Sequence, residues 1–100
     1  MIMKSKAIIL NVKDNVATAL ASLAANSELQ LSVSGSTLRV KLRSDIPFGH
    51  KFSLVTIEKG QPVVKYGEVI GVATSTIPLG EHVHVHNVVS TRGRGQQGRE

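Results

Sequence analysis

The sequence predicts a small, mostly β domain with one short α-helix. Short runs rich in Val, Ile and Leu recur along its 100 residues, and turns containing Gly, Pro, Asn or Asp separate them. A single Ala- and Leu-rich stretch provides the helix. One helix is too few for the crossovers of a parallel α/β sheet, so that class is disfavoured. The length fits one domain, and an aromatic content of 3% means that the core must be aliphatic.

The amino-terminal part is expected to hold a strand followed by the helix. Residues 6–12 form a short β-branched run that is typical of a buried strand. Asp14 and Asn15 then precede the Ala- and Leu-rich residues 16–24. Either of the two polar side chains can cap a helix of two to three turns, which should end near Asn26.

The rest of the chain is predicted to be strands and turns. Residues 29–33 and 38–42 alternate apolar and polar side chains on either side of Ser34-Gly-Ser36, which predicts a hairpin with Arg39 and Lys41 facing solvent. Further strands are expected at residues 52–57, 63–65, 69–73 and 81–89, with turn-rich segments between them. No internal repeat is evident. We expect a domain over residues 1–91, followed over residues 92–100 by a mobile Gly/Arg-rich tail or by the start of a linker to a larger domain.

Composition excludes several classes of function. The chain has no cysteine, which excludes disulfides, Cys-ligated zinc, iron–sulfur clusters and thiol nucleophiles. The same absence favours an intracellular, cytoplasmic location. No run approaches the length of a membrane span, and no signal peptide is evident. The net charge is +5, but the scarcity of aromatic residues argues against a stacking platform for nucleic acid.

The densest chemical signal is the run His82-Val-His-Val-His86. In a strand, His82, His84 and His86 would project from one face, while Val83 and Val85 would face the core. Two imidazoles about 6.5–7 Å apart along a strand can share a divalent ion, and the third would contact substrate or form a hydrogen bond. The alternative is an exposed polar face that happens to be rich in histidine.

A second signal is Gly49-His50-Lys51. The glycine allows a sharp turn that presents both following side chains. His50 could bind a metal or transfer a proton, and Lys51 could bind a carboxylate or act as a base. The alternative is a solvated loop. The neighbouring segment Lys65-Tyr-Gly-Glu68 also offers charge, although an exposed ion pair and a packed tyrosine explain it equally well.

Five segments in order along the chain carry a resemblance to a known family. They are Asp14-Asn-Val-Ala17, Asp45-Ile-Pro-Phe-Gly-His-Lys-Phe52, Lys65-Tyr-Gly-Glu-Val-Ile-Gly71, His82-Val-His-Val-His-Asn87 and Arg92-Gly-Arg-Gly95. Together they resemble the amino-terminal SAF domain of the altronate/galactarate dehydratase family. The resemblance implies a β-clip fold and dehydration of a sugar acid to a 2-keto-3-deoxy acid. It also implies a divalent metal, iron or alternatively manganese, and a large catalytic domain or subunit as partner.

The reaction suggests roles for the polar residues. Abstraction of the proton beside a carboxylate needs a base, an acid for the leaving hydroxyl, and a metal to stabilise the developing charge. On this logic His84 and His86 are the expected metal ligands, and His50 and Lys51 the expected catalytic groups. The expected substrate contacts are His82, Asn87, Lys65, Arg92 and Arg94.

Other functions stay open at this stage. A related family member with a separate small subunit removes sulfite from sulfolactate, so this chain could be such a subunit. It could also be a non-catalytic module that binds a sugar acid, or an RNA-associated protein that reads phosphate through its basic surface. Self-association into a homo-oligomer is equally open.

Overall fold

The computed structural model describes residues 2–4 and 6–91, and confirms a mostly β domain. Its strands form three small sheets, in the orders β1-β4-β5, β2-β3-β6-β9 and β10-β8-β7. The strands are β1 (Ile2–Lys4), β2 (Ala7–Ile8), β3 (Val16–Ala19), β4 (Glu28–Val33), β5 (Ser36–Lys41), β6 (Lys51–Ser53), β7 (Pro62–Lys65), β8 (Glu68–Ala73), β9 (His82–Val83) and β10 (Val88–Ser90). In the described part, no helix has the length and apolar character to cross a membrane.

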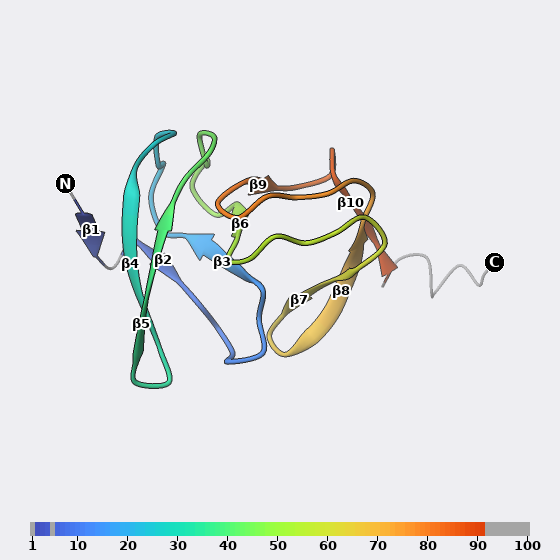
Figure 1. Cartoon of the computed structure of the whole chain (residues 1–100), viewed down its shortest axis with the longest axis horizontal. Helices are drawn as coiled ribbons and strands as arrows, with labels where there is room; N and C mark the ends of the chain where they lie inside the picture. The colour runs from blue at the N-terminus through green and yellow to red at the C-terminus, as the bar shows by residue number, and fades with distance from the viewer. Residues whose placement is uncertain (1, 5, 92–100) are drawn as a thin grey trace.

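The four-stranded sheet lies between the other two sheets and divides the core in two. Figure 1 shows β4 and β5 at one end of the molecule and β7, β8 and β10 at the other. One cluster of buried side chains is built around Phe52 and the β4–β5 hairpin, and the other around Val63, Ile77 and Val83. Apart from Phe52, both clusters are aliphatic, as the composition predicts.

The predicted helix over residues 16–24 is wrong. Val16–Ala19 forms β3, which pairs with β2 on one side and β6 on the other. The helix-forming alanines are used instead as small core residues, since Ala17 and Ala19 are both buried. Tertiary pairing on both edges of a strand outweighs the weak preference that alanine has for a helix.

Asp14 and Asn15 consequently do not cap a helix. The Asp14 carboxylate accepts hydrogen bonds from the backbone N–H groups of Tyr66 (3.1 Å) and Gly67 (2.8 Å), at the turn between β7 and β8. Both turn residues are left-handed, with φ of 60° and 73°. Asn15 accepts a bond from the N–H of Val64 at 2.8 Å. The two side chains thus fasten an early loop to a distant hairpin, and Tyr66 is exposed rather than packed in the core.

The predicted hairpin over residues 29–42 is confirmed. β4 and β5 pair antiparallel in continuous register from Glu28↔Lys41 to Val33↔Ser36. The turn residues Ser34 and Gly35 both have positive φ, as a tight two-residue hairpin requires. Arg39 and Lys41 point to solvent, as expected. The strands expected at residues 6–12 and 52–57 are much shorter, because regular strand pairing ends at Ile8 and at Ser53.

A turn of one form recurs four times in the part of the chain that the structure describes, although no repeat is evident in the sequence. Four turns share one form, in which a buried aliphatic residue is followed three positions later by a residue with positive φ. The pairs are Leu23 and Asn26, Ile46 and Gly49, Ile57 and Gly60, and Ile77 and Gly80. The aliphatic residues bridge in two pairs, Leu23 with Ile46 and Ile57 with Ile77. These turns hold the sheets together without long strands.

Candidate functional site

The predicted final strand over residues 81–89 is broken by a turn. β9 ends at Val83, residues 84–87 form the turn, and β10 begins at Val88. Val83 is fully buried, as predicted, but Val85 is 82% exposed, so the prediction that it faces the core is wrong. The strict alternation of faces applies only within a continuous strand, and it ends where the turn begins.

Asn87 holds this turn in place. Its side-chain amide donates to the carbonyl of His82 at 2.8 Å and accepts from the N–H of His84 at 3.0 Å. The residue is only 5% exposed. An asparagine side chain that bonds backbone groups in this way substitutes for a further strand pairing. Asn87 was expected to contact substrate, but its amide group is engaged with the backbone of the histidine segment.

The turn gathers the histidines instead of spacing them along a strand. His50 enters from the end of the Pro47–Gly49 turn, just before β6, and β6 pairs with β9 so that Phe52 lies opposite His82. The ring centroids of His50 lie 4.2 Å from His84 and 5.1 Å from His82, in stacked arrangements. The ring centroids of His82 and His84 are 5.5 Å apart. Residues that are 32 positions apart in the chain therefore share one site.

Three of these side chains can bind one metal ion. One ring nitrogen from each of His50, His82 and His84 lies within 4.8 Å of the others, and we call these residues the histidine trio. Nδ1 of His50 is 2.8 Å from Nε2 of His82. Two nitrogens bound at about 2.1 Å to one ion at right angles lie about 3 Å apart, so this pair is already near the required separation. Imidazole ligands suit iron, zinc, copper and nickel.

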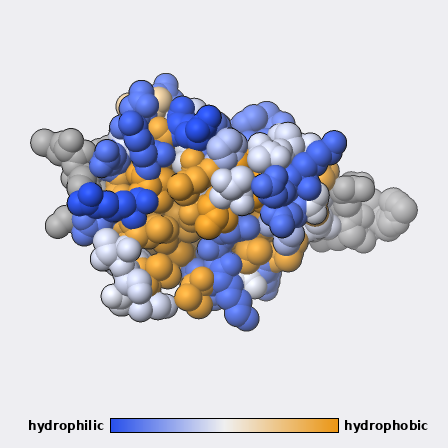
Figure 2. Space-filling model, in the orientation of Figure 1, coloured by the Kyte–Doolittle hydropathy of each residue, from blue (hydrophilic) through white to orange (hydrophobic). Residues whose placement is uncertain are grey.

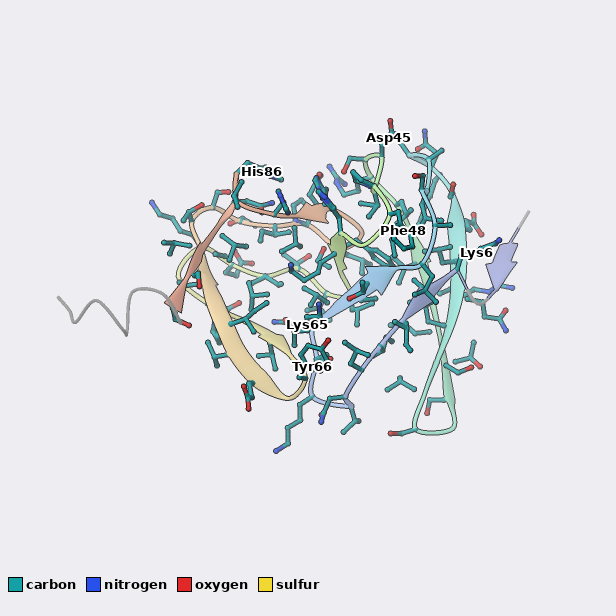
Figure 3. All side chains as sticks on the ribbon, turned by 180° about the vertical axis from the view of Figure 1, so that it is seen from behind. Lys6, Asp45, Phe48, Lys65, Tyr66 and His86 are labelled. Carbon is teal, nitrogen blue, oxygen red and sulfur yellow. The ribbon has the colours of Figure 1, made fainter. Side chains whose placement is uncertain are left out.

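His86 lies beside the trio rather than in it. Its ring centroid is 5.3 Å from that of His82, in a tilted arrangement. Figure 3 shows His86 on the segment that links β9 to β10, at the edge of the molecule. The structure therefore brings three of the four histidines to one point and leaves the ring of the fourth beside that of His82.

The surroundings of His82 and His84 favour the neutral form of both imidazoles. Burial, followed by the neighbouring imidazoles, lowers the pKa of His82, although Glu81 acts in the opposite direction. The pKa of His84 is lowered by desolvation first, and then by His50 and Lys51. Neutral imidazole is the form that binds a metal. Both directions therefore favour metal binding near neutral pH.

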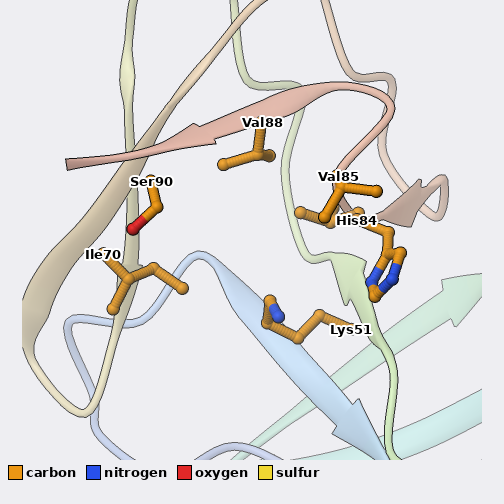
Figure 4. A pocket seen from close by; sticks show the side chains of 7 residues that line it. Lys51, Ile70, His84, Val85, Val88 and Ser90 are labelled. Carbon is orange, nitrogen blue, oxygen red and sulfur yellow. The ribbon is translucent and has the colours of Figure 1, made fainter. Parts of the chain in front are cut away.

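A pocket of about 300 Å³ opens beside His84. Its lining residues are Lys51, Ile70, Val83, His84, Val85, Val88 and Ser90. Figure 4 shows the side chain of Lys51 running from β6 into this pocket, between His84 on one side and Ile70 on the other. Burial, and secondarily the positive charge of Lys65, lower the pKa of the Lys51 ammonium. No acidic side chain of the described part forms a salt bridge with Lys51.

Ser44 and Glu81 form hydrogen bonds next to the backbone of His82, and the sequence pattern did not identify them. The Ser44 hydroxyl donates to Oε2 of Glu81 at 2.7 Å, and the same oxygen accepts from the N–H of His82 at 3.1 Å. Arg43 lies 3.8 Å from Glu81 through its Nε atom. The signal available in the sequence was the position of Glu81 directly before the histidine run.

The other residues expected to contact substrate are not assembled at the trio. Nζ of Lys65 lies 5.2 Å from the ring centroid of Tyr66, and Figure 3 shows both at the β7–β8 hairpin, well apart from His86. Arg92 and Arg94, together with the predicted tail, lie outside the described residues.

Comparisons with known proteins place this site in a family context. The family model for the altronate/galactarate dehydratase SAF domain matches residues 5–91. Altronate dehydratase from Escherichia coli (strain K12) is 53% identical over 74 residues, which are 74% of this chain and 14% of that protein. Altronate dehydratase from Bacillus subtilis (strain 168) is 40% identical over 75 residues, 75% of this chain and again 14% of the relative. The chain thus spans about one seventh of the length of these two relatives.

A second kind of relative is much closer in size. The (2R)-sulfolactate sulfo-lyase subunit alpha from Paracoccus pantotrophus is 40% identical over 57 residues, which are 57% of this chain and 85% of that protein. The protein of the same name from Chromohalobacter salexigens is 41% identical over 56 residues, 56% of this chain and 60% of that protein.

Proposed function

Because the chain belongs to the altronate/galactarate dehydratase SAF domain family, we propose that it is the small domain or small subunit of a sugar-acid dehydratase. The preferred substrates are altronate or galactarate, and the product is a 2-keto-3-deoxy acid. The observation that carries this proposal is the 53% identity to an altronate dehydratase over 74 residues. Since those residues are 14% of that relative, the chain would complete an active site whose larger part lies elsewhere.

The histidine trio would hold a divalent metal, with ferrous iron as the preferred ion and manganese as the alternative. Three neutral imidazoles with nitrogens within 4.8 Å of one another form a suitable donor set. The earlier expectation paired His84 with His86. The geometry favours His50 and His82 as the partners of His84, because their nitrogens lie closest together. When bound, the metal supplies a positive charge that stabilises the anion formed when a proton leaves the carbon beside the carboxylate.

The remaining side chains of the site would orient the acid and move its protons. Lys51 reaches into the pocket beside His84 without an acidic partner in the described part, which makes it a suitable ligand for a carboxylate. The lowered pKa of its ammonium brings it closer to the range of a general base. Asn87 acts indirectly, because it holds the backbone of His82 and His84 in place.

The direct test is an activity assay with the chain in its assembled form. The chain would be combined with the large dehydratase-type polypeptide encoded beside it or continuous with it, which we call the catalytic part. Ferrous iron is supplied anaerobically, and altronate, galactarate and sulfolactate are offered in parallel. We expect a keto-acid product only when both parts are present, and loss of product with His84→Ala. A folded complex that converts none of the three acids would refute an enzymatic role and favour a binding module.

The same assay separates the second candidate, a small subunit of a sulfolactate sulfo-lyase. The observation that favours it is size, since the match covers 85% of one such subunit. Release of sulfite from sulfolactate, with altronate and galactarate left unchanged, would establish this alternative.

A further inference from the structure

The turn between β9 and β10 exposes an aliphatic side chain, and no feature of the turn requires an apolar residue at that position. Val85 is 82% exposed, more than any other large hydrophobic side chain in the part of the chain that is described. It follows His84 directly and also lines the pocket beside that residue. Figure 2 shows that hydrophobic side chains also gather over the centre of one face of the molecule. The surface at Val85 is distinguished from other exposed apolar residues by its continuity with the histidine trio.

Apart from Lys51 and His84, the lining of this pocket suits an aliphatic side chain better than the hydroxyl groups of a sugar acid. Its lining includes four aliphatic residues, Ile70, Val83, Val85 and Val88. Figure 4 shows Val85 beside His84, and Ile70 on the far side of Lys51. The pocket volume of about 300 Å³ is at the lower end of the ~300–1,000 Å³ typical of pockets for small molecules. The hydroxyl groups of a sugar acid would lie unpaired against the valines, which is costly.

We propose that Val85 and this pocket form the surface on which the catalytic part docks, with an aliphatic side chain of that part entering between Val85, Val88 and Ile70. The identity of the partner depends on the proposed function. The chain spans only 14% of the altronate dehydratases, and the sulfo-lyase relatives are named as one subunit, so most of each relative or its complex lies outside this fold. A side chain that fills a well-packed, desolvated pocket near the centre of an interface is a common source of binding energy.

Charge argues against two other occupants of the pocket. The chain's own residues 92–100 contain Arg92, Arg94 and Arg99, and the pocket already holds the Lys51 ammonium. A second copy of the chain would carry the same net charge of +5. Like charges repel across an interface, so a neutral or acidic surface is the better match. A partner seated here would also cover the histidine trio and exclude water from it.

The absence of cysteine makes the surface measurable by thiol labelling. Val85→Cys introduces a single thiol into the chain, and Val12→Cys is the matched control at another exposed valine. Val12 follows Asn11, whose side chain packs near Gly67 at the far hairpin. Alkylation by iodoacetamide is followed by mass spectrometry of the peptide that carries the variant position, in the free chain and in the assembled enzyme.

We expect assembly to slow alkylation at position 85 at least ten-fold and at position 12 less than two-fold. An unprotected Cys at 85 in an enzyme that forms product would overturn this docking surface and leave the proposed function intact. Protection without product would overturn the function only, and the absence of both would overturn both. Equal protection at the two positions, or protection that grows with the concentration of the free chain, would also overturn the assignment.

Discussion

His50 and His82 share a proton across two different segments of the fold. Nδ1 of His50 and Nε2 of His82 lie 2.8 Å apart, and one of these nitrogens must carry the hydrogen. A metal ion that binds both nitrogens has to displace that hydrogen. If an ion binds both nitrogens, the bridging hydrogen would move to the other nitrogen of its own ring, so two neutral imidazoles can become ligands by a change of tautomer.

Single substitutions of the trio should abolish metal binding, whereas substitution of His86 should not. Removing one of three ligands should weaken Fe²⁺ or Co²⁺ binding by more than the roughly 10–100-fold that is typical for loss of an outer hydrogen-bond partner. We expect this for His50→Ala, His82→Ala and His84→Ala, and a change below about 5-fold for His86→Ala, because no nitrogen of His86 belongs to the cluster of three ligand atoms. Calorimetric titration under anaerobic conditions measures it.

The His86 variant decides between two ligand sets. If His86→Ala loses metal as completely as His84→Ala, while His50→Ala binds normally, the ligands are the pair that a straight strand would place together. The geometry described here would then have no role in metal binding.

The metal-free domain should lose stability as the pH falls below neutrality. Burial and the neighbouring imidazoles hold the pKa of His82 and His84 below the ordinary value of 6.5 in the folded state. The unfolded chain therefore binds more protons between that value and the lower folded values, so unfolding becomes more favourable as pH falls through this window. Urea denaturation in a chelator at pH 7.5, 6.5 and 5.5 should show a declining free energy of unfolding. The double variant His82→Gln/His84→Gln should show a shallower decline; an equal slope would assign the effect to other groups.

Local patterns predicted the elements whose pairing is local. The β4–β5 hairpin is visible in the alternation of residues 29–42 and in the Ser34–Gly35 turn, because each strand's partner is its neighbour in sequence. The helix predicted where β3 lies was wrong because this strand pairs with segments that are not adjacent to it in sequence. Its partners are β2 and β6, and pairing with β6 brings Ala17 opposite Phe52, 35 positions away, which no local propensity contains.

The same contrast between local and distant pairing applies to the candidate site. The three-histidine run and Gly49-His50-Lys51 were both identified from composition and spacing, but their meeting depends on the pairing of β6 with β9. The turn at residues 84–87 follows from hydrogen bonds of the buried Asn87 amide, which reads in sequence as one more polar residue after the histidines. The residue types could therefore be predicted from the sequence, whereas the grouping of His50, rather than His86, with His82 and His84 depends on the fold.

Asn87→Ala should weaken both the fold and the metal site. The substitution leaves the N–H of His84 and the carbonyl of His82 without their side-chain partner. Each buried group left unpaired costs about 1–3 kcal/mol, so we expect a loss of about 2 kcal/mol in the free energy of unfolding. Metal affinity should fall roughly 10–100-fold through displacement of the ligands. Asn87→Asp keeps the acceptor for the N–H of His84, so it should recover part of the stability and part of the metal affinity. If the two variants behave alike, Asn87 does not position the histidines through this acceptor.

Val83 and Val85 form a matched pair for testing the turn. Both are valines in the same segment, but Val83 is fully buried and Val85 is 82% exposed. Val83→Asp would place a carboxylate in the core and should cost more than about 4 kcal/mol, which unfolds most domains of this size. Val85→Asp in the free chain should change the free energy of unfolding by no more than about 0.5 kcal/mol. Circular dichroism with urea denaturation measures both; a stable Val83→Asp protein would contradict the burial of β9.

The hydroxyl of Thr18 offers a test of the central sheet. Its Oγ1 atom is buried and has no hydrogen-bond partner in the described part of the chain, while Thr18 itself pairs in register with Ile8 and Lys51. Thr18→Val keeps the shape and the β-branched preference for a strand but removes the unpaired oxygen, so the free energy of unfolding should rise by about 1 kcal/mol. Thr37→Val, on the exposed side of β5, is the control and should be near neutral. Destabilisation by Thr18→Val would mean that the hydroxyl has a partner in solution, such as an ordered water molecule.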